Sequence, residues 1–397
     1  MIKGHMISRF ALVFLMSSLQ AEDWPQFRGP GGEGHSAEKN LPLQWSETSN
    51  IAWKTAIPGR GWSSPSVSNG AVWLTAEVDT GLHLYSLESK SGKILKDITV
   101  FSPRSLGTQH AKNTHASPTP ILEDGRVYVH FGSHGTAAVN TDGQILWKTT
   151  MDYEPMHGTG GSPVIFKDLL IFSCDGTDVQ FVVALNKNTG KVKWKTSRKT
   201  YMAFSTPLLI KVDGKDQVVS PGAYRTVSYD PNNGKELWSV SYGEGFSNVS
   251  RPVFGHGLVF LSSGFNRADL LAVKPGGEVV WKYGRSVSLT PSFLLVGDEL
   301  YMISDNGIAT CFDAKAGKVH WQQRLSGTFS ASPTFADGRI YFQNEDGETV
   351  VIAPGKEFRK LATNQIDGQT LASMAVSDGQ ILLRSATHLY AIRTAKP

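Results

Sequence analysis

The feature that most constrains the fold of this chain is a short pattern that recurs along it. In residues 311–321, CFDAKAGKVHW, a small or polar strand end is followed by a Gly-containing turn and an apolar strand start. Self-similarity of this kind indicates a copied structural unit, so one closed domain can accommodate a chain of 397 residues. The same order of features recurs in ALNKNTGKVKW (184–194), SYDPNNGKELW (228–238), AVKPGGEVVW (272–281), AVNTDGQILW (138–147) and SLESKSGKIL (86–95).

A second landmark precedes each turn: a small or polar residue, then Pro, then an apolar strand. Its copies follow one another at about 40 to 50 residues, a period that suits four strands with their turns. The copies are Ser64-Pro65, Ser117-Pro118, Ser162-Pro163, Thr206-Pro207, Arg251-Pro252, Thr290-Pro291 and Ser332-Pro333, with Ser373-Met374 as a degenerate eighth.

The seventh copy, SPTFADGRIYFQNEDGETVVIAPGKEFRKLA, shows how each unit folds. Pro333 begins a strand, where its missing N–H does little harm, and three Gly turns close successive hairpins, which gives four antiparallel strands. Such sheets bury both faces when they stack radially. Because only 19% of the residues are charged and Gly is abundant, the composition also favours an all-β chain. We therefore predict an all-β, eight-bladed β-propeller of four-stranded antiparallel blades over residues 45–397.

The sequence also predicts how the ring closes. The eighth copy, SMAVSDGQILLRSATHLYAIR, supplies only three strands before the chain stops. Residues 49–59, SNIAWKTAIPG, are similar to the strands that end other copies, yet no three strands precede them. We therefore expect residues 49–57 to pair with residues 387–393, so that an N-terminal strand completes the last blade.

Each tryptophan that follows a Gly turn has a structural explanation. A large ring at this place can fill the wedge between adjacent blades and cover a turn of the neighbouring blade. A role in ligand binding is the alternative, and we predict the packing role for Trp53, Trp147, Trp194, Trp238, Trp281 and Trp321.

Residues 1–21 have the layout of a secretory signal peptide: Lys3 and Arg9 precede the apolar run Phe10 to Met16, and small and polar residues end at Ala21. The apolar run is too short to span a bilayer. We expect an exported protein, periplasmic or extracellular, with no membrane span and with residues 22–44 as a leader segment.

Charge and cysteine content limit the partners further. Without Lys3 and Arg9 the 39 basic residues become 37, against 35 acidic ones, which gives no electrostatic argument for a nucleic-acid partner.

We also expect the protein to be a monomer. Cys174 and Cys311 fall in different repeats, and we expect them to be buried small residues, a disulfide between them being the alternative.

The x-Asp/Asn-x-x-x-Gly-Lys-x-x-Trp pattern with its upstream Ser-Pro strand resembles the pyrroloquinoline quinone (PQQ) repeat. That repeat is found in quinoprotein alcohol dehydrogenases and in BamB-like outer-membrane assembly propellers. The resemblance covers residues 45–397, and DWPQFRGPGGEGHS (23–36) is similar to the leader of exported PQQ-like propellers. The resemblance implies the fold. It does not decide the function, because the same repeat occurs in enzymes and in binding scaffolds.

The segments that precede the Ser-Pro strands should meet at one rim of the central channel, where propeller sites usually form. They are 58–62, 109–115, 156–161, 201–204, 246–249 and 327–329, and they are rich in His, Arg, Asn and aromatic residues. From them and the adjacent Arg251 we select, as candidate cofactor- or ligand-binding residues, Arg60, Trp62, His115, His157, Asn248 and Arg251.

Alternatives exist for these residues. Arg60 and Arg251 could clamp a carboxylate of PQQ or of an acidic polymer, or each could pair with a carboxylate of the protein itself. His110, His115 and His157 could bind a transition metal, but their spacing matches no standard motif, and we predict polar loop contacts or hydrogen bonds to a ligand, and no metal. The acidic stretches 175–178, 305–307 and 344–348 are predicted to be hairpin turns and not calcium sites.

The function predicted from the sequence is an exported scaffold with a polar axial pocket, which binds a protein partner or a small-molecule ligand at the channel mouth. The alternative is a PQQ-dependent dehydrogenase that oxidises an alcohol or sugar in the periplasm. The resemblance implies PQQ and calcium for that alternative, but the chain shows no confident match to the catalytic Asp or the calcium ligands, and the sequence leaves the cofactor open. A third possibility is a module that presents a blade edge to a protein partner by β-augmentation.

Overall fold

The computed structural model describes residues 22–79 and 81–394. The predicted signal peptide, residues 1–21, lies outside the described residues. Within them, no helix is long and apolar enough to cross a membrane.

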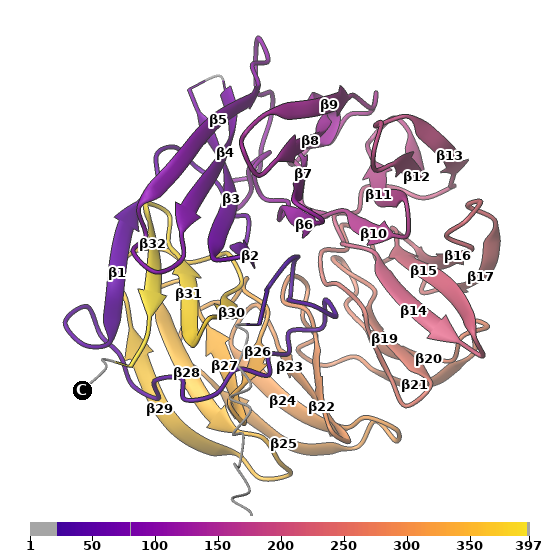
Figure 1. Ribbon diagram of the computed structural model, residues 1–397. Helices are drawn as coiled ribbons and strands as arrows, with labels where there is room; N and C mark the ends of the chain where they lie inside the picture. The colour runs from indigo at the N-terminus through magenta and orange to yellow at the C-terminus, as the bar shows by residue number, and fades with distance from the viewer. Residues whose placement is uncertain (1–21, 80, 395–397) are drawn as a thin grey trace, which may run out of the picture.

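In this described part of the chain, thirty-two strands form eight four-stranded sheets that surround a central axis (Figure 1). We number these blades 1 to 8 in chain order. Blades 1 and 2 contain β2 (Ser66–Ser68), β3 (Ala71–Val78), β4 (Gly81–Glu88), β5 (Ile94–Phe101), β6 (Ile121–Glu123), β7 (Arg126–His130), β8 (Thr136–Asn140) and β9 (Ile145–Thr149). The short 3-10 turn η1 (Gly132–His134) joins β7 to β8.

The remaining blades follow the same plan. Blades 3 and 4 contain β10 (Val164–Phe166), β11 (Leu169–Asp175), β12 (Gln180–Asn186), β13 (Val192–Ser197), β14 (Leu208–Val212), β15 (Lys215–Pro221), β16 (Arg225–Tyr229) and β17 (Glu236–Ser241). Blades 5 and 6 contain β18 (Val253–Gly255), β19 (Leu258–Ser262), β20 (Leu270–Val273), β21 (Val279–Tyr283), β22 (Leu294–Val296), β23 (Glu299–Ile303), β24 (Ile308–Asp313) and β25 (Val319–Arg324). Blades 7 and 8 contain β26 (Thr334–Ala336), β27 (Arg339–Gln343), β28 (Glu348–Ala353), β29 (Arg359–Gln365), β30 (Ala375–Ser377), β31 (Gln380–Arg384), β32 (His388–Ile392) and β1 (Ile51–Ala56).

Each blade is an antiparallel meander whose first strand lies nearest the axis (Figure 1). Middle strands are buried on both faces, as in β31, whereas outer strands such as β13 alternate between exposed and buried residues. The reason is that the apolar core lies between blades: Ile171 of blade 3, for example, belongs to one buried cluster with Val218 and Val227 of blade 4. The predicted fold class is confirmed.

The ring closes as the sequence predicts. β1 pairs antiparallel with β32, and the pairs Lys54 with Tyr390 and Thr55 with Leu389 set the register. The order β1-β32-β31-β30 makes the first strand of the chain the outer strand of blade 8. Figure 1 shows the two strands side by side, in the colours of opposite ends of the chain.

A Trp-x-Thr clasp joins neighbouring blades. In blade 2, Trp147 Nε1 donates to Lys187 O of blade 3 at 2.9 Å, and Thr149 Oγ1 donates to Gly190 O at 2.8 Å. The Trp147 ring covers Gly190, where an added Cβ would lie 2.5 Å from it. The same two hydrogen bonds join Trp53 and Thr55 to blade 1, and Trp194 and Thr196 to blade 4.

These contacts confirm the packing role predicted for the tryptophans, with one variation. Trp281 and Trp321 also donate to a turn carbonyl of the next blade, at 3.0 Å each. Trp238 instead donates to Gln217 Oε1 of its own blade, at 2.7 Å. Both cysteines are buried and free, so no disulfide joins Cys174 to Cys311.

The leader crosses the axis of the ring (Figure 1). Trp24 pairs with Val67 of β2 through two backbone hydrogen bonds of 2.9 and 2.8 Å, and Pro25 O accepts from Leu122 N of β6. On the other side, Phe335 of β26 exchanges hydrogen bonds with Gly34 and Ser36. The leader thus binds inner strands on opposite sides of the ring and fills the space between them.

We predict that the glycine beneath a clasp is needed for more than its backbone angle. Gly234 and Gly214 are turn residues of blade 4 with φ of 75° and 76°. A Cβ at Gly234 would lie 2.5 Å from both Trp194 and Thr196, whereas a Cβ at Gly214 meets nothing within 4 Å. Gly214→Ala should cost about 1–2 kcal/mol of unfolding free energy for its left-handed backbone. Gly234→Ala should cost about 1–3 kcal/mol more for the clash.

Urea denaturation of the two variants measures this difference directly, because backbone strain is common to both. Equal losses of unfolding free energy in Gly234→Ala and Gly214→Ala would show that the clasp does not press on the turn.

Candidate functional site in the axial cavity

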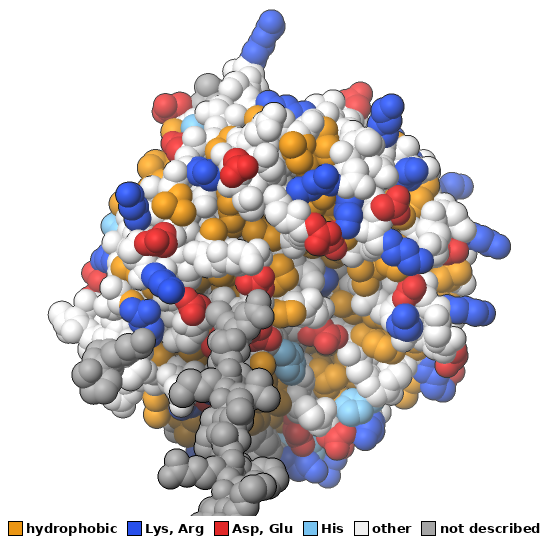
Figure 2. Space-filling view, in the orientation of Figure 1, with side chains coloured by type: hydrophobic (Ala, Val, Ile, Leu, Met, Phe, Trp, Pro, Cys, Tyr) orange, Lys and Arg blue, Asp and Glu red, His pale blue; other side chains and the backbone are white. Residues whose placement is uncertain are grey.

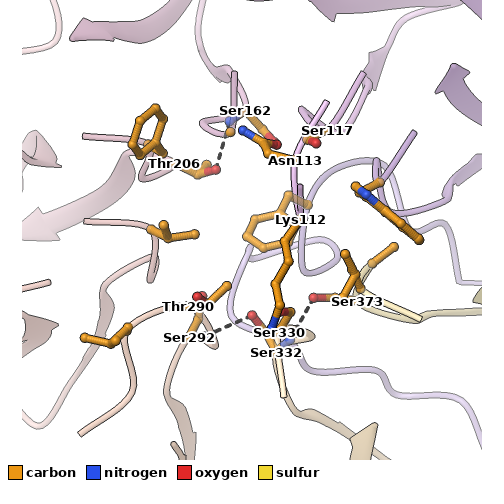
Figure 3. A pocket seen from close by; sticks show the side chains of 18 of the residues that line it. Lys112, Asn113, Ser117, Ser162, Thr206, Thr290, Ser292, Ser330, Ser332 and Ser373 are labelled. Carbon is orange, nitrogen blue, oxygen red and sulfur yellow. Dashed lines mark hydrogen bonds between the residues drawn. The ribbon is translucent and has the colours of Figure 1, made fainter. Parts of the chain in front are cut away.

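A cavity of about 510 Å³ opens on the axis at the end of the ring where the innermost strands begin (Figure 3). Phe27 of the leader lines it, so the leader closes the cavity from the opposite side. Its volume lies within the range of small-molecule sites.

A belt of hydroxyl groups encircles this cavity, with one position per blade. In each case the position lies two residues before the first strand of the blade. The backbone N–H at one position donates to the hydroxyl at the next: Ser64 to Thr119 (3.1 Å), Thr119 to Ser162 (2.9 Å), Ser162 to Thr206 (2.9 Å), Arg251 to Ser292 (3.0 Å), Ser292 to Ser332 (3.0 Å) and Ser332 to Ser373 (2.9 Å). We call Thr119, Ser162, Thr206, Ser292, Ser332 and Ser373 the hydroxyl belt.

The belt corrects the Ser-Pro landmark at two blades. In blades 2 and 6 the equivalent positions are Thr119 and Ser292, because β6 begins at Ile121 and β22 at Leu294. Ser117-Pro118 and Thr290-Pro291 therefore lie two residues too early. At these positions the hydroxyl accepts an N–H from the neighbouring blade whether Pro follows it, as after Ser162, or not, as after Ser292.

Arg251 replaces the hydroxyl in blade 5, and its guanidinium holds the leader. Its Nη1 donates to Phe27 O at 2.9 Å and its Nε to Pro207 O at 3.2 Å. Arg28 of the leader lies nearby and donates to three carbonyls, including Phe293 O at 2.7 Å. Burial lowers the pKa of Arg251 to about 10 and, together with the charge of Arg251, that of Arg28 to about 9.

The wall above the belt is largely aromatic. Trp62, Phe204, Phe246 and Phe265 line it, and the Phe246 and Phe265 rings meet edge to face with centroids 5.5 Å apart. Phe265 is 54% exposed, so the aromatic wall continues to the mouth of the cavity.

Polar residues from the segment between β5 and β6 cover part of the mouth. Lys112 Nζ donates to Glu345 Oε1 of blade 7 at 2.8 Å, and Ser330 Oγ donates to the same oxygen at 2.6 Å. Figure 3 shows Lys112 lying across the cavity toward Ser330 and Ser332. Nearby, the rings of His110 and His157 are perpendicular, with centroids 5.8 Å apart.

The structure brings only part of the predicted site together. Trp62 and His157 line the cavity. Arg60 is exposed, and its backbone pairs with Glu77. Asn248 is buried outside the lining, where its Nδ2 donates to Ser262 O at 3.0 Å and Tyr242 Oη at 3.1 Å.

His115 and Arg251 are likewise buried outside the cavity lining. His115 donates its backbone N–H to the Glu77 carboxylate. Its ring meets that of His134 edge to face, with centroids 4.4 Å apart. The guanidinium of Arg251 donates to carbonyls, and among residues 22–79 and 81–394 it has no carboxylate partner. The cofactor-binding role of the six residues stays a prediction.

Residues that the sequence did not single out complete the cavity. The hydroxyl belt would be visible from the sequence if the copies were aligned on their strand starts. Phe27 and Phe265 have no counterpart in the repeat, and the contact of Lys112 with Glu345 joins segments 233 residues apart.

The cavity lining does not fit a PQQ and calcium pair. Calcium in proteins is held by oxygen ligands that usually include carboxylates. No Asp or Glu lines the cavity, and among residues 22–79 and 81–394 no group of three His, Cys, Asp or Glu is placed to hold a metal. A quinone with several carboxylates would meet one charged lining residue, Lys112.

Sequence comparison relates the chain to known propellers. A family profile described as outer membrane protein assembly factor BamB matches residues 37–173, 96–275 and 266–395. The outer membrane protein assembly factor BamB of Bordetella pertussis (strain Tohama I) is 23% identical over 320 residues, which cover 75% of this chain and 77% of that protein. The protein of the same name from Moranella endobia is 22% identical over 288 residues, covering 68% of this chain and 67% of the relative.

Structure comparison finds the same fold in proteins of different kinds. BamB from Moraxella catarrhalis superposes with a TM-score of 0.62 at 12% identity, covering 86% of this chain and 99% of that chain. Quinohemoprotein alcohol dehydrogenase from Comamonas testosteroni superposes with a TM-score of 0.70 at 12% identity, covering 94% and 81%. The computationally designed Ika8 protein gives a TM-score of 0.60 at 13% identity, covering 89% and 100%. At these identities the likeness shows the fold alone.

We predict that the belt stabilises the ring. Thr206→Val removes the acceptor of the buried Ser162 N–H, which should cost about 1–3 kcal/mol of unfolding free energy. Thr349→Val is the matched control, because Thr349 is buried and its hydroxyl has no partner among the described residues. Denaturant titration that gives equal stabilities for the two variants would contradict a role for the belt.

We also predict an acid-sensitive contribution from His115. Burial, with a smaller effect of His134, lowers its pKa from 6.5 to about 4. The unfolded chain therefore takes up a proton more readily, and stability is lost as pH falls from about 6.5 to about 4, at about 1.4 kcal/mol per pH unit. His115→Phe keeps a planar ring that cannot be protonated, so it should lose less stability over this interval. Parallel stability curves for the two proteins would refute this assignment.

Proposed function

The chain belongs to the BamB family of β-propellers, and from this premise we propose that it is an exported scaffold that binds a protein partner at the mouth of the axial cavity. The family profile supports the proposal, since its matches reach from residue 37 to residue 395. The relatives from Bordetella and Moranella are by name assembly factors of outer membrane proteins. We place the chain in the periplasm or outside the cell, on the expectation that residues 1–21 are a signal peptide.

The observation that carries the proposal is an apolar patch on the mouth face of three consecutive blades. Met156 precedes blade 3, Tyr224 lies in the β15–β16 hairpin of blade 4, and Phe265 follows β19 of blade 5. They are 48%, 42% and 54% exposed. We call these residues the mouth patch. Exposed apolar side chains on the same side of neighbouring blades can contribute contact area to a protein-binding surface.

Aromatic contacts support the mouth patch from below. Tyr201 packs on Phe246 with ring centroids 6.2 Å apart, and Phe246 packs on Phe265. A rigid aromatic anchor of this kind gives a partner contact area with little loss of side-chain freedom. Figure 2 shows the face of the ring opposite the mouth, where basic and acidic side chains are interspersed and no large region carries one charge.

The dehydrogenase alternative has no comparable observation in its favour. The quinohemoprotein enzymes share the fold, but the axial lining here carries no carboxylate to hold calcium. Presentation of a blade edge would use the outer strands, where Val192 and Leu237 are exposed. Binding at a blade edge can be distinguished from binding at the mouth by experiment, because Val192 and Leu237 lie on β13 and β17 and not at the mouth.

We predict that photo-crosslinking will locate the partner at the mouth. A benzophenone amino acid at position 265 or 156, in cells of the source organism, should give a discrete adduct whose partner is identified by mass spectrometry. The same amino acid at position 192 or 237 tests an equally exposed apolar site on an outer strand. Recovery of the identified partner should fall about tenfold in Phe265→Ser, because aromatic anchors dominate such interfaces.

Adducts at positions 192 and 237 without adducts at the mouth would replace the proposal with binding at a blade edge. Absence of adducts at all four positions would overturn a protein-binding role for this surface.

A further inference from the structure

We infer that the axial cavity is a binding site for a small organic monocarboxylate that carries an apolar ring or chain, with the carboxylate held by the hydroxyl belt and Lys112. The inference concerns the interior of the ring. The site shares Phe265 with the mouth patch, but its test measures a small ligand and not a protein partner.

The first argument is the unused hydrogen-bonding capacity of the belt. A Ser or Thr hydroxyl can donate one hydrogen bond while it accepts others. All six belt hydroxyls accept a backbone N–H, and none donates to any residue in the described part of the chain. Five of the six residues are at most 4% exposed, Ser373 is 6% exposed, and all six line the cavity.

These hydroxyls therefore present donors to whatever occupies the cavity. Figure 3 shows Thr206, Ser292, Ser332 and Ser373 around the same open space. A buried donor without an acceptor costs free energy, so an occupant with exposed oxygen acceptors is favoured. A carboxylate is the strongest common acceptor and contributes two oxygens to such a ring of donors.

The second argument is the charge around the axis. Lys112 is the single charged residue of the lining. Beyond Phe27 lie the guanidiniums of Arg28 and Arg251, and within the described residues neither forms an ion pair with a carboxylate. Glu33 is the acidic residue near them, and its Oε1 accepts from Phe254 N at 3.3 Å. At the mouth Glu345 balances the charge of Lys112, whereas at the leader end two guanidiniums stand beside one acidic residue, Glu33. This excess of positive charge at the leader end favours an anion over a cation.

The third argument limits the rest of the ligand. Four aromatic side chains, with Val249 and Leu371, surround the space above the belt. Asn113, the one amide of the lining, donates its Nδ2 to His157 O at 2.8 Å. A sugar needs acceptors for its many hydroxyl protons, and the lining offers it no carboxylate. A single lysine suits one carboxylate better than several, while the aromatic wall suits an apolar ring or chain.

Lys112 can bind such a ligand while it keeps its ion pair with Glu345. An ammonium has three N–H donors, and one of them satisfies Glu345 Oε1, which also accepts from Ser330 Oγ. The other donors can bind a ligand carboxylate, so that Glu345 is not left without its cation.

The test uses the purified full chain and naphthalene-2-carboxylate as the probe, with naphthalene-2-carboxamide as the uncharged control. Isothermal titration calorimetry at pH 7 should give one saturable site for the carboxylate, with at least about tenfold weaker binding of the amide. Lys112→Met should weaken carboxylate binding about tenfold and leave amide binding nearly unchanged.

Lys274→Met is the matched control variant. Lys274 has a similarly exposed side chain, 54% against 50% for Lys112, and it also pairs with a glutamate, Glu278, at 3.0 Å. It lies in the turn between β20 and β21, remote from the cavity, and its replacement should not change probe binding. Ser332→Ala removes one belt donor and should weaken carboxylate binding severalfold with unchanged circular dichroism.

Three results would overturn the inference: no saturable binding of the carboxylate at millimolar concentration, equal binding of acid and amide, or equal effects of Lys112→Met and Lys274→Met. Because crosslinking at the mouth patch reports on a protein partner, failure of one test leaves the other interpretable. If the protein binds the carboxylate saturably but yields no crosslinked partner, its role is that of a small-molecule receptor.

Discussion

Backbone hydrogen bonding between β1 and β32 joins both ends of the chain into one sheet, and the closure of the ring depends on it. A blade of four strands has two large apolar faces, and it hides both only if it has a neighbour on each side. With β1 in place, Trp53 also reaches blade 1, so the clasp continues across the junction of the two chain ends. Without that pairing the two faces beside the junction would be open to solvent.

Three sets of contacts lie around the axis. The leader crosses the axis, where Arg251 binds it, the hydroxyl belt surrounds the adjoining cavity, and the Trp-x-Thr clasps join the outer turns. The leader occupies its end of the channel as a bound ligand would. Arg251 of the ring donates to the leader carbonyl of Phe27, and Arg28 of the leader donates to the ring carbonyl of Phe293. The leader does not fill the axial cavity, and the side chains that line it are free to contact a ligand from outside the chain.

The sequence predicts the blades and their outer turns better than the contacts at the axis. Turn glycines and tryptophans recur with the repeat, so the blades, the closing strand and the covering of Gly190 by Trp147 can be derived from them. The leader has no periodicity, and nothing in residues 22–38 indicates that they enter the channel. Arg251 sits at a repeat position, but its direction depends on Phe27, 224 residues away. Contacts at the axis join one residue from each of several blades, and a pattern within one repeat cannot specify them.

The separation of these contacts along the chain has a consequence for folding kinetics. Ser377 Oγ donates to Glu22 O across 355 residues, and Trp45 N donates to Asn364 Oδ1 across 319. The leader and β1 are made first, yet their partners in blades 7 and 8 are made last. Such non-local contacts fold slowly, because loop closure must precede the contacts that compensate for it. Once formed, the ring can open only when strand pairing and leader contacts are lost together, so its lifetime is set by a high unfolding barrier.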